Sequence, residues 1–166
     1  MLAAHYQLMA RFNAWVNRTI YDATAGLGDA ECRKTRPEAY FGSIHNTLNH
    51  LLVVDRLWFT RIEDKPPPAL KLDQILYADA GELRAARERE DARIVALVDG
   101  FAEDDLAKSI TYKDTFGRPW TMLRWHMLST VFNHQTHHRG QVHAMIKEAG
   151  AEPPAMDVPV YLRSLA

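Results

Sequence analysis

The sequence predicts an all-α protein, a four-helix bundle with one long crossover and a short hairpin before the last helix. Two observations support this fold class. Apolar residues recur at three- and four-residue spacing over four long segments, which is typical of amphipathic helices. Only one short stretch alternates between apolar and polar residues like a strand. Because 166 residues are enough to bury a hydrophobic core, we expect residues 1–166 to form a single domain.

The first half of the chain should contain two of these helices. The first is expected from Leu2 to about Ala25, where Gly26 and Gly28 end it. The second should begin near Ser43, because serine is a good N-cap residue, and run to about Ile62, before a run of prolines. The polar segment Asp29–Phe41 between them is expected to be irregular.

A third helix is predicted from its capping residues. Asp79 and Glu82 are spaced like a capping box, and Gly100 closes the segment. Within it, charges of both signs alternate, which predicts a solvated face. These charged residues are Arg84, Arg87, Glu88, Arg89, Glu90 and Asp91.

The C-terminal third should hold a hairpin and the last helix. Weak alternation in Ser109–Tyr112, followed by turn residues in Asp114–Pro119, predicts a small hairpin or an extended loop. The last helix is then expected from Trp120 or Thr121 to Ala149. The proline-containing tail after it should be extended and pack along the body.

Histidines interrupt the apolar face of this last helix. His134 and His138 lie one turn apart and about 40° around the axis, so two neutral imidazoles can share one ion. His137 is about 60° from His134 on the other side and should point elsewhere. A third ligand must come from another segment, and His50 is the candidate because sites in bundles form between facing helices. Three ligands with open positions are typical of a catalytic or exchangeable metal site. The alternative is that these histidines are simply hydrogen-bonded or solvated.

Four further residues near these helices invite interpretation. Asp55 interrupts an apolar stripe, and burying an unpaired carboxylate is costly. It should either pair with an arginine such as Arg18 or orient a ligand imidazole. Gly140, inside a helix, predicts the close approach of another helix. Arg139 and Gln141 are candidate contacts for an anionic or polar substrate, although Arg139 faces about 100° away from His138 and is expected at a surface or interface.

The composition excludes several classes of function. Lys and Arg total 20 against 21 acidic residues, which favours neither a nucleic-acid partner nor an anionic membrane surface. No stretch approaches the roughly 18 consecutive apolar residues of a spanning helix. The single cysteine, Cys32, excludes an intrachain disulfide and a cysteine-rich zinc site, so we expect a cytoplasmic protein. The glutamate of the HExxH zinc-peptidase motif is also missing.

Three segments together resemble the DinB family. They are Phe12-Asn-Ala-Trp-Val-Asn17, Ser43-Ile-His-Asn-Thr-Leu-Asn-His50 with Asp55-Arg-Leu-Trp58, and Asn133-His-Gln-Thr-His-His-Arg-Gly-Gln141. This is the damage-inducible metal-binding family, not the DNA polymerase that shares the name. The resemblance implies an up-and-down-like four-helix bundle, often a homodimer, with metal ligands at His50, His134 and His138. It also implies kinship with enzymes that use bacillithiol or mycothiol to open, isomerise or conjugate small electrophiles.

Two functions follow as hypotheses. The first is an enzyme, a metal-dependent thiol transferase or hydrolase, with one divalent ion (zinc or nickel) and a low-molecular-weight thiol as cosubstrate. The sequence assigns no catalytic residue beyond the ligands. The second is a non-catalytic role, in which the ion bridges two helices or the protein buffers metal during stress. Nucleic-acid binding is a weaker third idea, against which the charge balance argues.

Overall fold

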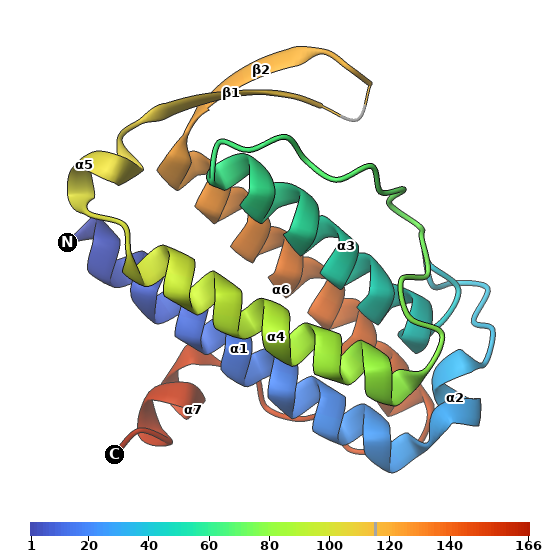
Figure 1. Cartoon of the computed structure of the whole chain (residues 1–166). Coiled ribbons are helices and arrows are strands. Elements are labelled where there is room, and N and C mark those ends of the chain that lie inside the picture. The colour runs from blue at the N-terminus through green and yellow to red at the C-terminus, as the bar shows by residue number, and fades with distance from the viewer. Residues whose placement is uncertain (115) are drawn as a thin grey trace.

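The computed structural model describes residues 1–114 and 116–166, and its four long helices form a bundle (Figure 1). Helices α1 and α3 each pack against both α4 and α6, so α1 lies diagonally opposite α3. No helix in these residues combines the length and apolarity needed to cross a membrane. The predicted fold class is confirmed, and the long helices are α1 (Leu2–Leu27), α3 (Ile44–Ile62), α4 (Ala80–Asp99) and α6 (Arg124–Glu148).

The long crossover sets the direction of the helices. Asp55 pairs with Arg87, and further along Glu63 pairs with Arg93, so α3 and α4 run parallel. The connection 63–79 therefore travels back along the bundle before α4 begins, as Figure 1 shows. The up-and-down order implied by the family resemblance is modified accordingly. Two neighbouring helices run one way, and α1 and α6 run the other.

Side-chain caps define where two of the long helices begin. The Ser43 hydroxyl accepts a hydrogen bond from the backbone N–H of Asn46 at 3.1 Å, and α3 follows. The Asp79 carboxylate accepts from the N–H of Glu82 at 2.8 Å, and α4 follows. Gly28, with φ of 83°, ends α1 in a conformation that favours glycine. These predicted boundaries are confirmed.

Three short helices in the described chain lie outside the four predicted helices. The segment from residue 29, which was predicted to be irregular, contains α2. Asp29 and Arg33, one turn apart on this helix, form an ion pair of 2.7 Å that stabilises it. The tail is extended only in part, because Pro159 fits the first turn of a final helix. The short helices are α2 (Asp29–Arg33), α5 (Glu103–Leu106) and α7 (Val158–Arg163).

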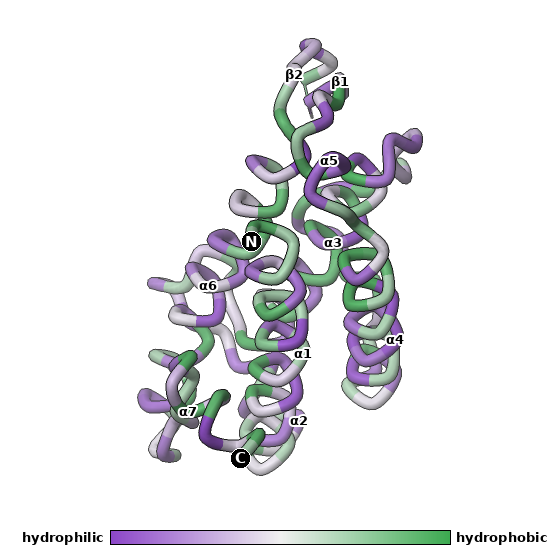
Figure 2. The backbone as a smooth tube through the Cα atoms, turned by 90° about the vertical axis from the view of Figure 1, so that its left-hand side faces the viewer, coloured by the Kyte–Doolittle hydropathy of each residue, from purple (hydrophilic) through white to green (hydrophobic). Residues whose placement is uncertain are grey.

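The predicted hairpin is present and projects beyond one end of the bundle (Figures 1 and 2). Strands β1 (Ser109–Lys113) and β2 (Pro119–Leu123) pair antiparallel. Thr115, in the predicted turn, lies outside the described residues. The last helix does not begin at Trp120 or Thr121 as predicted, because both residues belong to β2 and pair with β1.

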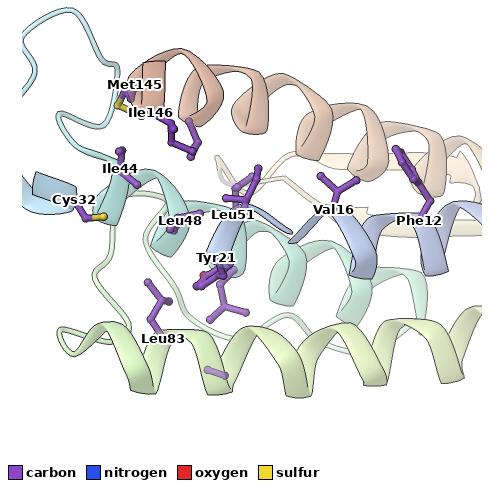
Figure 3. Close-up of a cluster of buried hydrophobic side chains, with 14 of the residues drawn as sticks. Phe12, Val16, Tyr21, Cys32, Ile44, Leu48, Leu51, Leu83, Met145 and Ile146 are labelled. Atoms are coloured by element: carbon purple, nitrogen blue, oxygen red, sulfur yellow. The ribbon is translucent and has the colours of Figure 1, made fainter. Parts of the chain in front are cut away.

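Two hydrophobic clusters fill the bundle, one toward each end. Hydrophilic and hydrophobic residues alternate along the long helices in Figure 2, as expected for elements with one buried face. Figure 3 shows the cluster around Phe12, Leu48, Leu83 and Ile146, to which all four long helices contribute. The second cluster lies nearer the hairpin and includes Tyr6, Phe59, Ile94, Met127 and Val131.

A layer of buried charges separates these clusters. Asp55 is fully buried, lies 2.7 Å from Nη1 of Arg87, and accepts a hydrogen bond of 2.6 Å from Nε2 of Gln135. Nη2 of Arg87 lies 2.9 Å from Oδ1 of Asp91. The expectation of an arginine partner was right in kind, but Arg18 was the wrong residue. The alternative was also wrong, because the partners of Asp55 in the described chain include no imidazole.

The predicted solvated face of α4 is only partly correct. Arg87, Glu90 and Asp91 are buried, whereas Glu88 and Arg89 are exposed. A mixed-charge pattern indicated solvent because isolated charges are costly to bury. Here opposite charges from neighbouring helices pair with one another inside the protein, which offsets part of that cost.

Arg139 and Gly140 also differ from expectation. Arg139 is buried, not at a surface, and its Nη1 donates to Oδ1 of Asn13 at 2.8 Å and of Asn17 at 3.3 Å. Asn17 in turn donates to Asp91 at 2.9 Å. A Cβ placed on Gly140 would meet nothing within 4 Å, so this glycine does not mark a close helix contact.

Candidate metal centre

Three histidine rings converge where α3 packs against α6. The ring centroids of His50 and His134 are 5.1 Å apart, those of His50 and His138 are 4.6 Å apart, and those of His134 and His138 are 4.4 Å apart. One nitrogen from each ring lies within 4.8 Å of the others, so the group could hold a metal ion. The antiparallel packing of α3 on α6 places position 50 beside 134 and 138. The convergence expected from the sequence is present.

Hydrogen bonds fix the tautomer of two of these rings. Nδ1 of His50 lies 2.7 Å from the carbonyl oxygen of Leu72. Nδ1 of His138 lies 2.7 Å from Oε1 of Gln141. Because both oxygens can only accept, both Nδ1 atoms carry the proton and each neutral ring has its lone pair on Nε2. Anchoring the outer nitrogen in this way is the usual arrangement around metal-binding histidines.

The third histidine of the cluster, His134, has no such hydrogen bond at Nδ1 among the described residues. Its Nε2 faces Nε2 of His50 at 3.2 Å, which places two ring nitrogens at the centre of the cluster. Its Nδ1 is buried without a hydrogen-bond partner among the described residues. Two of the three imidazoles are therefore anchored from outside the cluster, and packing alone holds the third.

Burial keeps the three imidazoles neutral. Desolvation lowers the pKa of His50 to about 4 and that of His134 to about 3, and neighbouring histidines add to both shifts. Desolvation also lowers the pKa of His138. Only a neutral imidazole has a lone pair to offer a cation, so the cluster is ready to bind one at neutral pH. Three uncharged nitrogen donors suit zinc, nickel, copper or iron.

The side chain of Gln141 contacts two histidines of α6. Its Oε1 accepts from His138, and its Nε2 lies 3.2 Å from Nε2 of His137. In the described chain, the group that could hold an ion does not include His137, as the helical spacing predicted. Gln141, considered from the sequence as a substrate contact, lines the cavity and is also one turn from His138, whose ring it orients. The three-residue spacing was the signal for this role.

A cavity of about 830 Å³ opens beside the histidines. The ring of Phe41 stacks on that of His50, with centroids 3.9 Å apart. Apart from Gln141, no non-histidine residue of the described wall was predicted from the sequence as part of the site. Tyr40 and Phe41 come from the loop before α3, Asn46 from the first turn of α3, and Leu72, Asp73 and Ile75 from the crossover.

Asn49 holds the crossover against the cavity. Its side chain is fully buried, and Oδ1 accepts from the backbone N–H groups of Leu76 at 2.9 Å and Tyr77 at 3.0 Å. Its Nδ2 donates to the Tyr77 carbonyl at 3.2 Å. Residues 72–77 are thus tied to the turn of α3 that carries His50. The sequence motif contained Asn49, but nothing in the spacing indicated that its partner would be the backbone of a distant loop.

Comparison with known proteins identifies the family of the chain. The sequence model of the DinB family matches residues 1–165. Protein DinB of Bacillus subtilis (strain 168) is 26% identical over 157 residues, which cover 91% of this chain and 90% of that protein.

Two solved structures share the fold. A DinB-like protein from Bacillus cereus ATCC 10987 has a TM-score of 0.64 at 22% identity, covering 84% of this chain and 89% of that one. The DinB-like protein YjoA from Bacillus subtilis has a TM-score of 0.58 at 16% identity, covering 94% and 97%. With the family match spanning nearly its whole length, the chain belongs to the DinB family.

Proposed function

We propose that this protein is a metal-dependent enzyme in which His50, His134 and His138 hold one divalent ion, zinc or nickel. The reaction is the addition of a low-molecular-weight thiol, or of water, to a small electrophilic substrate. The observation that carries this proposal is the position of three neutral imidazoles at the wall of an open cavity of about 830 Å³. An ion with only a bridging role would need no such access.

The chemistry follows from the uncharged donor set. An ion bound by three neutral imidazoles keeps its full positive charge and lowers the pKa of a bound thiol or water, which supplies a nucleophile at neutral pH. The chain's own residues supply orientation. The Leu72 carbonyl and Gln141 keep the Nε2 lone pairs of His50 and His138 directed into the cluster. Phe41 covers one face of His50 and keeps water from it.

The alternative is a non-catalytic protein that binds metal during stress or uses it to join α3 to α6. The two functions differ in what metal removal does. Under the enzyme proposal, removal abolishes turnover and leaves the chain folded, with only the loss in free energy of unfolding that release of any bound ion causes, because two hydrophobic clusters and a buried polar layer already hold the bundle together. Under the structural alternative, removal chiefly lowers that free energy.

The test uses the full chain purified without a histidine tag. Elemental analysis gives the metal content, and consumption of a small thiol is followed with an electrophile to which the thiol adds, such as an epoxide. We expect one divalent ion per chain, thiol consumption that stops on chelation, and recovery when zinc or nickel is restored. Loss of folded structure on chelation, with no thiol- or water-dependent turnover before it, would favour the structural alternative.

We also propose that the whole chain acts as one domain, in the cytoplasm, as a homodimer. The family resemblance supports the dimer, and the single cysteine among 166 residues supports a reducing compartment. Light scattering on the untagged protein should give a mass near twice the 19.0 kDa of one chain. A mass of one chain at micromolar concentration would contradict the dimer and leave the proposed reaction unaffected.

A further inference from the structure

Three exposed side chains at the mouth of the histidine cavity are apolar or aromatic. Tyr40, Leu72 and Ile75 are 84%, 45% and 43% exposed, and all three border this one cavity. Single exposed apolar side chains are ordinary, but several gathered at a concave site indicate a binding surface. We refer to these three residues as the apolar mouth.

The apolar mouth is held in place by the same contacts that orient the candidate ligands. Leu72 provides the carbonyl that accepts from His50. Tyr40 packs edge-on against Phe41 with ring centroids 4.8 Å apart, and Phe41 stacks on His50. The surface is therefore built into the site and is not a loose loop lying near it.

Apart from the proposed ion, the described side chains of the cavity wall carry charge of one sign only. Asp73 is the acidic residue of its wall, and none of the described residues that line the cavity is an arginine or a lysine. A buried arginine in a neighbouring wall, Arg36, already binds Glu31 at 2.6 Å. Arg139, next to His138 in sequence, is directed to Asn13 and Asn17. A thiol whose sulfur binds the ion would place its remaining groups against this wall, where an anionic group finds no cationic side chain among the described residues.

We propose that this cavity selects small molecules whose body is apolar or aromatic and is uncharged or positively charged, with Tyr40 and Ile75 as apolar contacts and Asp73 favouring a cation. The inference rests on the proposed function, because it concerns the molecule that meets the histidines there. It narrows that function: a thiol that carries several carboxylates is not the cosubstrate. An amine-bearing or aromatic thiol, or an aromatic electrophile, fits the wall.

The test separates selectivity from metal chemistry. The full chain is loaded with cobalt, and four thiols are titrated while the thiolate-to-cobalt absorption band is followed. The probes are phenylmethanethiol, 2-aminoethanethiol, 2-mercaptoethanol and 3-mercaptopropionate, each corrected for its own thiol pKa. We expect the aromatic and amine-bearing thiols to bind most tightly, mercaptoethanol next and mercaptopropionate most weakly.

Substitutions at Asp73 and Tyr40 test which residues cause the preference among the thiols. Asp73→Asn should remove the advantage of the amine over the alcohol, which we expect to be about 2- to 5-fold for an exposed charge. Tyr40→Ala should weaken phenylmethanethiol about 3- to 10-fold and mercaptoethanol less. Asp104→Asn on α5 and Leu165→Ala near the C-terminus, both exposed, are the matched controls and should change neither ratio.

The outcomes distinguish failure of the proposed selectivity from failure of the proposed function. Thiol binding that is tightest for mercaptopropionate, or equal for all four probes, overturns the selectivity and leaves the proposed function intact. If cobalt binds but no thiol changes its spectrum, thiol activation fails. The selectivity is then judged by saturation-transfer NMR with benzylamine and benzyl alcohol on the zinc-loaded protein. Tighter binding of the amine, lost in Asp73→Asn, supports the proposal, and equal or weaker binding overturns it.

Discussion

Two pairs of residues on one helix show how position alone separates a site from a scaffold. His134 and His138 face the cavity, and their ring nitrogens meet His50. Gln135 and Arg139, each one residue further along α6, face the interior and bind Asp55 and Asn13. One step along a helix turns a side chain by about 100°, which is enough to change its surroundings completely.

The two sets are completed in different ways. The buried polar layer contains two arginines and two aspartates, so its charges balance within the protein, and its members are Arg87, Arg139, Asp55 and Asp91. The histidine cluster instead directs uncharged nitrogens at one another, an arrangement that only a cation or a shared proton satisfies. We therefore expect the buried polar layer to govern the free energy of unfolding and the histidine cluster to govern metal binding.

The largest effect should come from breaking the polar layer. Asp55→Ala leaves Arg87 buried with one partner fewer, and removing one member of a buried ion pair typically costs about 3–5 kcal/mol. Chemical denaturation of the metal-free protein should show a loss of that order in the free energy of unfolding.

Two further variants serve as controls for this substitution. Asp55→Leu combined with Arg87→Met removes one charge of each sign and should recover much of the loss. Asp99→Ala breaks the exposed pair with Arg11, whose atoms are 2.8 Å apart, and should cost less than about 1 kcal/mol. If Asp55→Ala were as mild as Asp99→Ala, the polar layer would not be the scaffold described above.

The next effect concerns pH. Burial lowers the pKa of His50 to about 4 and that of His134 to about 3, so below pH 6.5 the unfolded chain takes up protons before the folded one does. The contribution of these two histidines to the free energy of unfolding of the metal-free protein should therefore fall as pH drops from about 6.5 and level off near pH 3 to 4. His134→Gln should make this decline shallower. A decline of unchanged steepness would show that His134 is not the group responsible.

A smaller effect is expected on removing the anchor of His138. Gln141→Ala frees Nδ1 of that ring, and loss of such an outer partner typically lowers metal affinity about 10- to 100-fold. Gln141→Glu keeps an acceptor at the same place and should restore most of the affinity. Competition with a chromophoric chelator measures both. Equal affinity in wild type and Gln141→Ala would mean that packing alone orients the ring.

The smallest effect is expected at Gly140, which follows Arg139 on α6. Because a Cβ there meets nothing within 4 Å, Gly140→Ala should add about 1 kcal/mol to the free energy of unfolding, the usual difference between the two residues within a helix. Thermal denaturation should show a higher midpoint with unchanged metal content. A lower midpoint would show that the glycine serves a contact after all.

Local patterns foretold the long helices, their caps and the histidine cluster, because helix periodicity and i, i+4 spacing carry that information. The same patterns wrongly predicted that Arg87 and Arg139 are exposed, because burial of a charge depends on a partner from another helix. They also missed Tyr40, Asp73 and Ile75 in the cavity wall. Those residues reach the site through loops, and the hydrogen bonds of Asn49 that position the crossover join residues far apart in sequence.

The most direct test of the central claim is the metal content of four alanine variants of the untagged protein. His50→Ala, His134→Ala and His138→Ala should each lose the ion or bind it at least about 100-fold more weakly, while remaining folded by circular dichroism. His137→Ala, next to His138 but outside the cluster, should keep one ion per chain. Undiminished metal content in the first three variants, or its loss only in His137→Ala, would contradict the account.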